Sequence, residues 1–501
     1  MAFLSPLEGS AGAVKSLCIV YVLRTLSILI LAWFTTFLFP SFSPLGYDTS
    51  STHVTGYSGV ISEGAGKHAT NLVDRLVTAL TRWDAIYFAS IARHGHRWEQ
   101  EWAFGVGQSY LVHGFQWILN LLGGCQMSPS SQILFLSICS CGSHLLSAIL
   151  LFHLTKILFE PARPTSTSST LGSGETPNIV AFVAATLHIL SPAGIFLIAP
   201  YNEPLFSALS FLGYFLYSYA VKNTALDGQH GIINEVCLLI SGLSFGISGL
   251  FRSNGIISGI LFVFEVSQAV WRLSSGTNPA ANIRLLLTSG VSGALVGIPT
   301  VWRQYQAWLE YCGVEALVQR VWCSKTLPSI YSFVQSHYWG VGFLKYWTPG
   351  NIPLFLLAAP MLYVLFKTSL DVMGVQNLAA SRLYSLALEQ TNRDLLFRLT
   401  VPQLLLATLA VTSYHVQIIT RLSSGLPMWY IVAAAALVQI TTATTGTKPS
   451  EAKDSPKFNE GGKTETDGLR NEASWVRPAV RFFLGYQVVQ AVLYGGFLPP
   501  A

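Results

Sequence analysis

The amino-acid sequence predicts an all-α membrane protein that crosses the bilayer many times. Its 501 residues are 51% hydrophobic and only 11% charged, whereas soluble domains carry about 25% charged residues. The mean hydropathy is +0.47, and long apolar runs recur along the whole chain. These observations exclude an ordinary soluble domain. The net charge of +5 is spread over loops rather than collected in one basic arm, which excludes a nucleic-acid-binding surface.

Eleven segments are long and apolar enough to span, since a transmembrane helix takes about 17–25 residues. The first is longer than a signal-peptide core and lacks a small-residue cleavage site, so we expect it to be retained. A further apolar stretch, 110–122, is too short and is predicted to be an amphipathic helix on the membrane surface. The predicted spans are 17–39, 132–158, 179–199, 203–221, 232–250, 255–271, 285–301, 352–366, 400–417, 427–446 and 479–498.

Lysine and arginine in the short loops set the expected orientation, with the N-terminus in the cytoplasm. The same parity places the charged, weakly apolar stretch 448–477 in the cytoplasm, where we expect disorder. The predicted divisions are a cytoplasmic N-terminus (1–16), a first transmembrane helix (17–39), a first loop on the opposite face (40–131), a multi-helix region (132–446) with a second long loop on that face (302–351), a disordered cytoplasmic loop (447–478) and a last transmembrane helix (479–501).

The face opposite the cytoplasm carries the distinctive polar residues. Long ordered loops between spans are uncommon unless they serve a function. We therefore expect the functional site on this face, which is predicted to contain the segments 40–131, 199–204, 251–255, 302–351 and 421–425.

The stretch that begins Arg82-Trp83-Asp84 combines a carboxylate with helical periodicity. Its apolar residues predict a helix with one face on the membrane, and they are Trp83, Ile86, Tyr87 and Ile91. Asp84 falls in the first turn, where the helix dipole favours a carboxylate by about 0.3–1 kcal/mol. It either caps the helix or pairs with Arg82, or it acts as a general base that accepts a proton from a substrate hydroxyl. Spacing alone does not choose between these roles.

The run RWDAIYFASIARHG, followed by WEQEWAF, resembles the first luminal loop of the GPI mannosyltransferase 2 family. Further motifs of that family follow in the same order: SPAGIFLIAPYNEPLFSALSF, LFRSNGI, CSKTLPSIYSFVQSHYWGVGFLKYW and RLSSGLPMWY. One departure follows Glu101, where similar proteins continue with an Ala-Phe-Phe-Pro-like sequence. This chain instead reads Ala103-Phe104-Gly105-Val106-Gly107.

The resemblance implies a GT-C type membrane glycosyltransferase of the endoplasmic reticulum, with about eleven transmembrane helices, a luminal active site and surface-lying helices in the first luminal loop. It implies inverting transfer of the second mannose, in α1,6 linkage, from dolichyl-phosphate-mannose to the GPI-anchor precursor. These two glycolipids and the membrane lipids are the expected partners, and an accessory membrane subunit is compatible with the family. The family's acidic residue in the first luminal loop matches Asp84, the expected catalytic base.

Other polar residues of this face are candidates for binding the acceptor or its sugars. They are Glu99, Glu101, Trp83, Asn202 and Glu203. Glu203 lies in the turn before an apolar run, so it is as readily explained as a helix cap.

The donor phosphate calls for cationic or hydrogen-bonding groups. Arg252 is the first choice, because a guanidinium forks onto phosphate oxygens and the following turn offers backbone N–H groups; the alternative is a snorkelling arginine at a helix end. Arg421, His337 and Tyr338 are weaker candidates, and Tyr338 also fits the ordinary aromatic belt of a membrane protein.

No cofactor is required by the sequence. His94 and His96 have no third ligand at convincing spacing, so no metal site is predicted, although a divalent cation that bridges the phosphate is compatible with the sequence. Of the seven cysteines, Cys312 and Cys323 share one polar segment. They are either a disulfide, which requires an oxidising compartment, or two free thiols.

Two rival functions come from other classes of protein. A polytopic secondary transporter would also have many Gly- and Pro-interrupted spans, but it should carry charges at mid-membrane, whereas these spans are mostly free of acids. A non-catalytic membrane subunit that supports a partner enzyme would leave Asp84 dispensable.

Overall fold

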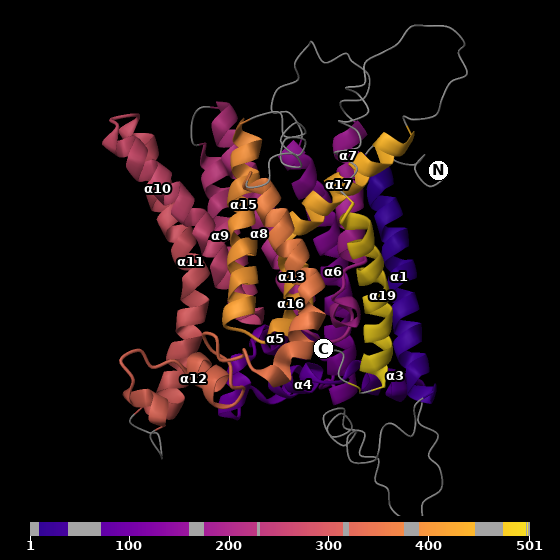
Figure 1. The fold of residues 1–501 in the computed structure, drawn as a ribbon. Helices are drawn as coiled ribbons and strands as arrows, with labels where there is room; N and C mark the ends of the chain where they lie inside the picture. Colours follow the sequence, from indigo (N-terminus) through magenta and orange to yellow (C-terminus); the bar gives the residue numbers. More distant parts are fainter. Residues whose placement is uncertain are drawn as a thin grey trace, which may run out of the picture.

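The computed structural model describes residues 10–38, 72–159, 175–227, 231–313, 320–374, 390–445, 474–496 and 498. Within these ranges the chain forms α-helices and short 3-10 helices, and no strand. Figure 1 shows the long helices side by side in one bundle, with the short elements gathered at one end. The all-α class is therefore confirmed. The predictions for 1–9, 39–71 and 446–473 lie outside the described residues.

Eight helices of the described ranges are long and apolar enough to cross a membrane, or nine spans if one bent pair counts as a single span. This confirms a polytopic membrane protein, and the total of eleven spans stays a prediction. The eight are α1 (Ser10–Leu38), α6 (Pro129–Phe159), α8 (Glu203–Asp227), α9 (Ile232–Phe251), η3 with α10 (Ser253–Gly259 and Ile260–Ser274), α11 (Pro279–Cys312), α13 (Ile352–Val372) and α15 (Gln390–Thr412). A further long helix, α19, covers Val476–Gly495.

The predicted span 179–199 is corrected, because α7 (Glu175–Ile189) ends ten residues earlier. Pro192 lacks the backbone N–H that a helix interior needs, and Gly194 adopts a φ of +52°, which favours glycine. The chain then turns through η2 (Gly194–Leu197) into α8. Arg24 of α1 donates to the Gly194 carbonyl oxygen at 2.8 Å, which satisfies irregular backbone inside the bundle.

The predicted span 400–417 is displaced along the chain, since α15 begins at Gln390 and ends at Thr412. It is followed by η6 (Val416–Ile418), α16 (Ile419–Leu422) and η7 (Ser423–Gly425). These short helices are bent by 79° from α17 (Pro427–Thr445). The result is a second irregular segment in the bundle, and it carries Arg421.

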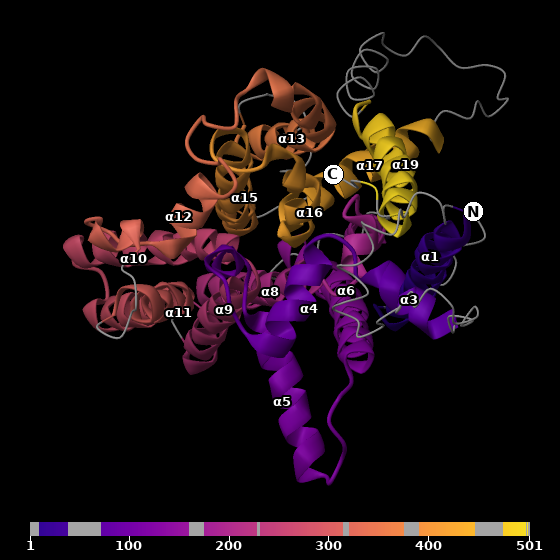
Figure 2. The same ribbon diagram turned by 90° about the horizontal axis from the view of Figure 1, so that it is seen from below.

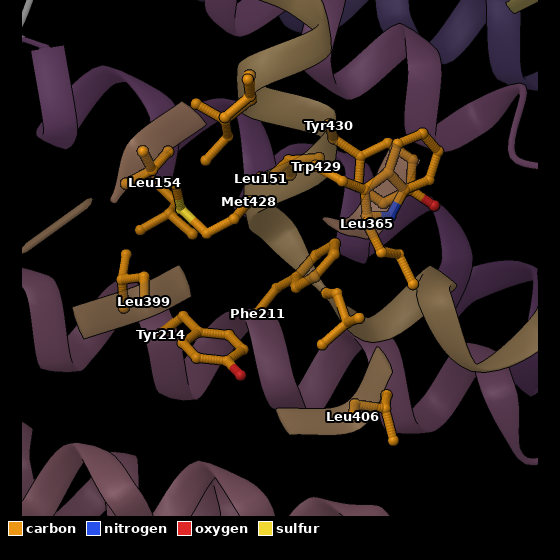
Figure 3. Packing of buried hydrophobic residues seen from close by; sticks show 14 of the residues in the cluster. Leu151, Leu154, Phe211, Tyr214, Leu365, Leu399, Leu406, Met428, Trp429 and Tyr430 are labelled. Atoms are coloured by element: carbon orange, nitrogen blue, oxygen red, sulfur yellow. The ribbon is translucent and has the colours of Figure 1, made fainter. Parts of the chain in front are cut away.

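Packing around α17 fixes this irregular segment in place. Figure 3 shows residues 428–430 of α17 among buried side chains of α6, α8, α13 and α15. The Trp429 backbone N–H donates to Gln403 Oε1 at 2.9 Å, and its indole N–H donates to the Ser423 carbonyl at 3.0 Å. Because Ser423 is two residues from Arg421, the core determines where that guanidinium lies.

The short elements lie together at one end of the bundle (Figure 1). Figure 2 shows α5 lying across this end and extending outward, so the predicted short helix exists, and its contact with a membrane surface stays a prediction. These elements are α3 (Leu72–Leu80), α4 (Asp84–His94), η1 (Glu99–Ala103), α5 (Gly107–Leu121), η4 (Val321–Ser324), α12 (Ile330–His337) and η5 (Pro349–Asn351).

Candidate active site

A cavity of about 450 Å³ opens at the end of the bundle where the short elements gather. Its volume lies within the range of about 300–1,000 Å³ that is usual for small-molecule sites. All five segments that the sequence places on one face contribute to its wall. They supply Trp83 and Asp84, Asn202, Arg252 with its neighbours, Tyr331 with Gln335 and Trp339, and Arg421.

The backbone that presents Asp84 is strained and firmly held. Asp84 is the first residue of α4, and the preceding Trp83 has φ 55° and ψ −127°, a rare conformation that costs about 1–3 kcal/mol for a residue with a side chain. The hydroxyls of Tyr201 and Tyr494 donate to the Arg82 carbonyl oxygen at 3.1 and 3.3 Å. Two tyrosines that are distant in the sequence, Tyr201 in the turn before α8 and Tyr494 in α19 (Val476–Gly495), thus hold the turn that carries Asp84.

Asp84 does not cap its helix. Trp83 occupies the N-cap position without a side-chain hydrogen bond, and the Asp84 carboxylate instead accepts from Arg421, with Oδ2 2.8 Å from Nη2. The Asp84 side chain is still 33% exposed, and no described residue donates to its Oδ1 atom. One carboxylate oxygen is therefore anchored while the other faces the cavity.

The helix that carries Asp84 packs differently from the prediction. Of the four residues expected on its apolar face, Ile91 is buried but Tyr87 is 38% exposed and lines the cavity. The buried face consists of three alanines, one phenylalanine and one isoleucine, namely Ala85, Phe88, Ala89, Ile91 and Ala92.

Glu203 is outside the cavity wall and pairs with two arginines that line it. Its carboxylate is fully buried, and Oε1 accepts from Arg252 Nη2 at 2.7 Å while Arg421 Nε lies 3.0 Å away. The Arg421 guanidinium also stacks near the rings of Phe196 and Tyr201, with Cζ 4.7 and 5.4 Å from their centroids. Two carboxylates and two guanidinium groups thus form one charge-balanced chain from Asp84 to Arg252.

Three polar atoms of the wall have no hydrogen-bond partner among the described residues. They are Arg252 Nε, Arg421 Nε and Asn202 Oδ1, all buried, although Arg421 Nε is within ion-pair distance of Glu203 and Asn202 Nδ2 donates to the Phe251 carbonyl at 2.9 Å. A buried polar atom without a partner is costly. Since all three residues line the cavity, a bound ligand can supply the missing partners.

The departure after Glu101 is explained by close packing over this turn. A Cβ atom on Gly105 would lie 2.2 Å from the Phe251 carbonyl oxygen, far inside contact distance. Glycine lets the segment pass directly over the residue that precedes Arg252, and Gly105 itself lines the cavity.

Glu99 and Glu101 are buried and lie outside the cavity wall. Glu99 accepts from the indole N–H of Trp322 and the hydroxyl of Tyr338, each at 3.1 Å. Glu101 accepts from the backbone N–H groups of Arg97 and Trp98 at 2.6 and 3.1 Å. Both carboxylates therefore have protein partners, and their role toward the acceptor stays a prediction.

The aromatic loop, residues 320–351 between α11 and α13, is joined to α11 by a disulfide and only partly lines the cavity. Cys312 and Cys323 form a disulfide, the first of the two alternatives. Tyr338 binds Glu99, and His337 stacks on Phe333 with ring centroids 4.9 Å apart; neither lines the cavity. Their contact with the donor phosphate stays a prediction.

Several wall residues were not singled out from the sequence. Tyr331, Tyr414, His415 and Gln417 line the cavity, and burial lowers the pKa of His415. The available signal was the polar stretch Ser413 to Gln417 between two apolar runs. Among the described residues, no group of three His, Cys, Asp or Glu side chains could hold a metal ion.

Comparison with known proteins places this geometry in a family. The profile of the family described as Mannosyltransferase (PIG-V) matches residues 19–501. A GPI mannosyltransferase 2 from Gibberella zeae is 36% identical over 87% of this chain and 88% of its own length. One from Aspergillus fumigatus is 35% identical over 100% of this chain and 99% of its own.

Among solved structures, the oligosaccharyltransferase of Archaeoglobus fulgidus matches 93% of this chain. The identity is 12% and the TM-score is 0.41, and the match spans 55% of that longer chain.

Proposed function

Because the chain belongs to the PIG-V mannosyltransferase family, we propose that its cavity transfers mannose from dolichyl-phosphate-mannose to the GPI-anchor precursor. In this proposal the product carries the second mannose in α1,6 linkage, and the anomeric configuration is inverted. The observation that carries the proposal is the position of Asp84, whose anchored carboxylate faces a cavity that also contains two arginines.

Inversion requires a single displacement at the anomeric carbon. The acceptor 6-hydroxyl oxygen forms the new bond to that carbon while the bond to the dolichyl phosphate oxygen breaks. Asp84 Oδ1 accepts the hydroxyl proton as general base, which contributes about 10²–10⁴-fold to such reactions. The departing phosphate carries the negative charge away, and no covalent intermediate on the enzyme is needed.

Arg252 is the proposed ligand of the departing phosphate. It lines the cavity, its Nε atom lacks a partner among the described residues, and guanidinium groups bind phosphate with paired hydrogen bonds. Arg421 is already engaged by Asp84 and Glu203, so it positions the base and adds its charge to the site. In this proposal the phosphate therefore lies at Arg252, and the base is Asp84 of the same cavity wall.

The test is substitution of Asp84 in cells that lack the endogenous activity. Asp84→Asn and Asp84→Ala should leave protein levels normal and cause the one-mannose GPI precursor to accumulate, as measured by mass spectrometry of the glycolipids. Glu235→Gln is the matched control, because Glu235 pairs with the half-exposed Arg284 away from the cavity. Cells that express this variant should form GPI precursors with two or more mannoses. Full rescue by both Asp84 variants would identify a non-catalytic subunit instead.

The proposed location is the endoplasmic reticulum membrane with the cavity on the luminal side. A glycosylation tag inserted between residues 340 and 345 should be modified, because the aromatic loop borders the cavity. A tag in 448–477 should remain unmodified. The reverse pattern would place the cavity in the cytoplasm.

A further inference from the structure

A second cavity, of about 610 Å³, lies between α8, α9, α10, α11 and α15. Figure 1 shows the turn between α10 and α11, which borders it, at the end of the bundle opposite α4 and α12. On α9, Leu238 lines this cavity and Phe251 lines the first one. Thirteen residues of α-helix rise about 20 Å. A ligand here is therefore separate from the reacting groups of the candidate active site.

A buried ion pair lines the second cavity. Arg398 of α15 pairs with Glu265 Oε1 of α10, and the Tyr217 hydroxyl donates to the same oxygen at 2.8 Å. Glu265 is 4% exposed, and no described residue donates to its Oε2 atom. An ionisable pair buried between spanning helices is costly and usually marks a functional site.

The remaining charges give the second cavity both signs. Its wall also contains Arg272 and Asp394, so two guanidinium groups and two carboxylates face one space. Arg272 makes no ion pair with a described residue. A ligand with only negative charge would meet the carboxylates, and one with only positive charge would meet the arginines. A ligand that carries a phosphate and an ammonium group satisfies both.

The surroundings of the second cavity suit a membrane lipid. The adjacent outer surfaces of α10 and α11 expose large apolar side chains, with Val270 52%, Trp271 68% and Leu287 63% exposed. In a membrane-spanning bundle such residues contact acyl chains, and tryptophan favours the level of the headgroups. A phospholipid can therefore lay its tails on this surface and its headgroup in the cavity.

We propose that the second cavity binds a phosphate–ammonium zwitterion as it occurs in phospholipid headgroups, with Arg272 on the phosphate and Glu265 Oε2 on the ammonium. This site is independent of the proposed mannosyl transfer. A lipid bound only to the folded protein stabilises it, so the stability of the purified protein should depend on such a lipid.

The test uses the purified full chain in detergent, with bound lipid counted by native mass spectrometry and unfolding followed by temperature. Dioleoyl phosphatidylethanolamine should bind and raise the unfolding midpoint. Dioleoyl phosphatidylglycerol, which lacks the ammonium group, should bind about tenfold more weakly, and dioleoylglycerol should not bind. Equal binding of phosphatidylglycerol and phosphatidylethanolamine would overturn the proposal that the ligand is a zwitterion. Soluble phosphoethanolamine distinguishes a phospholipid from a free phosphate–ammonium compound as the ligand. No change in the unfolding midpoint with phosphoethanolamine supports the phospholipid. A shift equal to that with phosphatidylethanolamine would overturn it.

Substitutions of Arg272, with a control at Arg284, test where the ligand binds. Arg272→Gln should weaken phosphatidylethanolamine binding about tenfold. Arg284→Gln is the control and should leave binding unchanged. Arg284 lies near the start of α11, pairs with Glu235 and does not line the cavity. Equal affinity of Arg272→Gln and wild type would overturn the site. If Arg272→Gln gives too little folded protein, Arg272→Lys replaces it, because lysine keeps the positive charge but lacks the paired N–H groups of a guanidinium. An affinity of Arg272→Lys equal to that of wild type would show that Arg272 does not bind the phosphate with paired hydrogen bonds. Mannosyl transfer should be unchanged in all three variants.

Discussion

Asp84 and Arg421, which are 337 residues apart in the sequence, form an ion pair with Arg421 Nη2 2.8 Å from Asp84 Oδ2. The same guanidinium reaches Glu203 through Nε, and Glu203 also holds Arg252. Four residues from four separate parts of the chain are therefore linked by one set of contacts. This arrangement makes the position of the proposed base depend on the irregular segment before α17.

Arg421→Lys should remove most of the transferase activity while keeping the charge. A lysine ammonium is a single compact charge, so it cannot place separate nitrogen atoms against Asp84 and Glu203 as a guanidinium does. We expect kcat to fall about 10²-fold, as for loss of one preorganised donor, in transfer assays with purified protein. Arg284→Lys, at a half-exposed pair, is the control and should keep full activity. Wild-type kcat in Arg421→Lys would show that the bridge is not needed.

Glu203→Gln should lower the free energy of unfolding of the protein. The carboxylate is fully buried and serves two arginines, and removal of one partner of a buried ion pair costs about 3–5 kcal/mol. Thermal unfolding should show a clearly lower midpoint. The double variant Glu203→Gln with Arg252→Gln should lose less than the sum of the two single variants, because the residues are in contact. An additive loss would contradict the proposed coupling.

Local patterns predicted the helices well, and they placed Asp84 correctly in the first turn of α4. They failed where the bundle contains irregular segments. The apolar run 179–199 has the length of a span, yet Pro192 and Gly194 end the helix early. These two residues could have been used to predict that end. The segment around Arg421 was harder to predict, because the contacts that hold it come from Gln403 and Trp429.

The partners of the charged residues could not be predicted from spacing. Helical periodicity relates residues three or four apart, whereas Asp84, Glu203 and Arg421 meet across hundreds of residues. The sequence allowed a cap or a neighbouring arginine for Asp84, and both are local partners. Glu99 shows the same limit, since its contact with Trp322 spans 223 residues.

Glu99→Gln distinguishes docking of the aromatic loop from binding of the acceptor. Glu99 accepts from Trp322 and Tyr338 of that loop, and loss of such charged hydrogen bonds costs about 1–3 kcal/mol. Limited proteolysis within 320–351 should therefore accelerate. Glu101→Gln is the matched control, because Glu101 binds only backbone near its own turn, and it should leave the loop protected. A raised KM for the acceptor with unchanged protection would favour the sugar-binding role.

The disulfide predicts a specific pattern of thiol labelling. The chain has seven cysteines, of which five are free. Alkylation of denatured, unreduced protein should add five labels, and seven after reduction. The double variant Cys312→Ser with Cys323→Ser should lose about 3 kcal/mol of stability, as expected for closure of a short loop. Seven labels before reduction would show two free thiols.

His96 should make the stability of the folded protein depend on acid pH. Its Nδ1 lies 3.0 Å from Arg303 Nη2, which can only donate, so Nδ1 accepts and Nε2–H donates to the Phe104 carbonyl oxygen at 3.1 Å. The folded state therefore holds a neutral ring. Burial first, and the adjacent arginine second, lower the pKa of His96 from 6.5 to about 4.

Because the pKa of His96 is lower in the folded than in the unfolded state, the unfolded chain binds the extra proton below pH 6.5. Stability should be unaffected by His96 above pH 6.5 and should fall between pH 6.5 and 4, by at most about 1.4 kcal/mol per pH unit. His96→Gln keeps a polar side chain that does not titrate, so its unfolding midpoint should fall less steeply over this range. Parallel curves for wild type and His96→Gln would show that the ring is already protonated, or that it is hydrated in the folded protein.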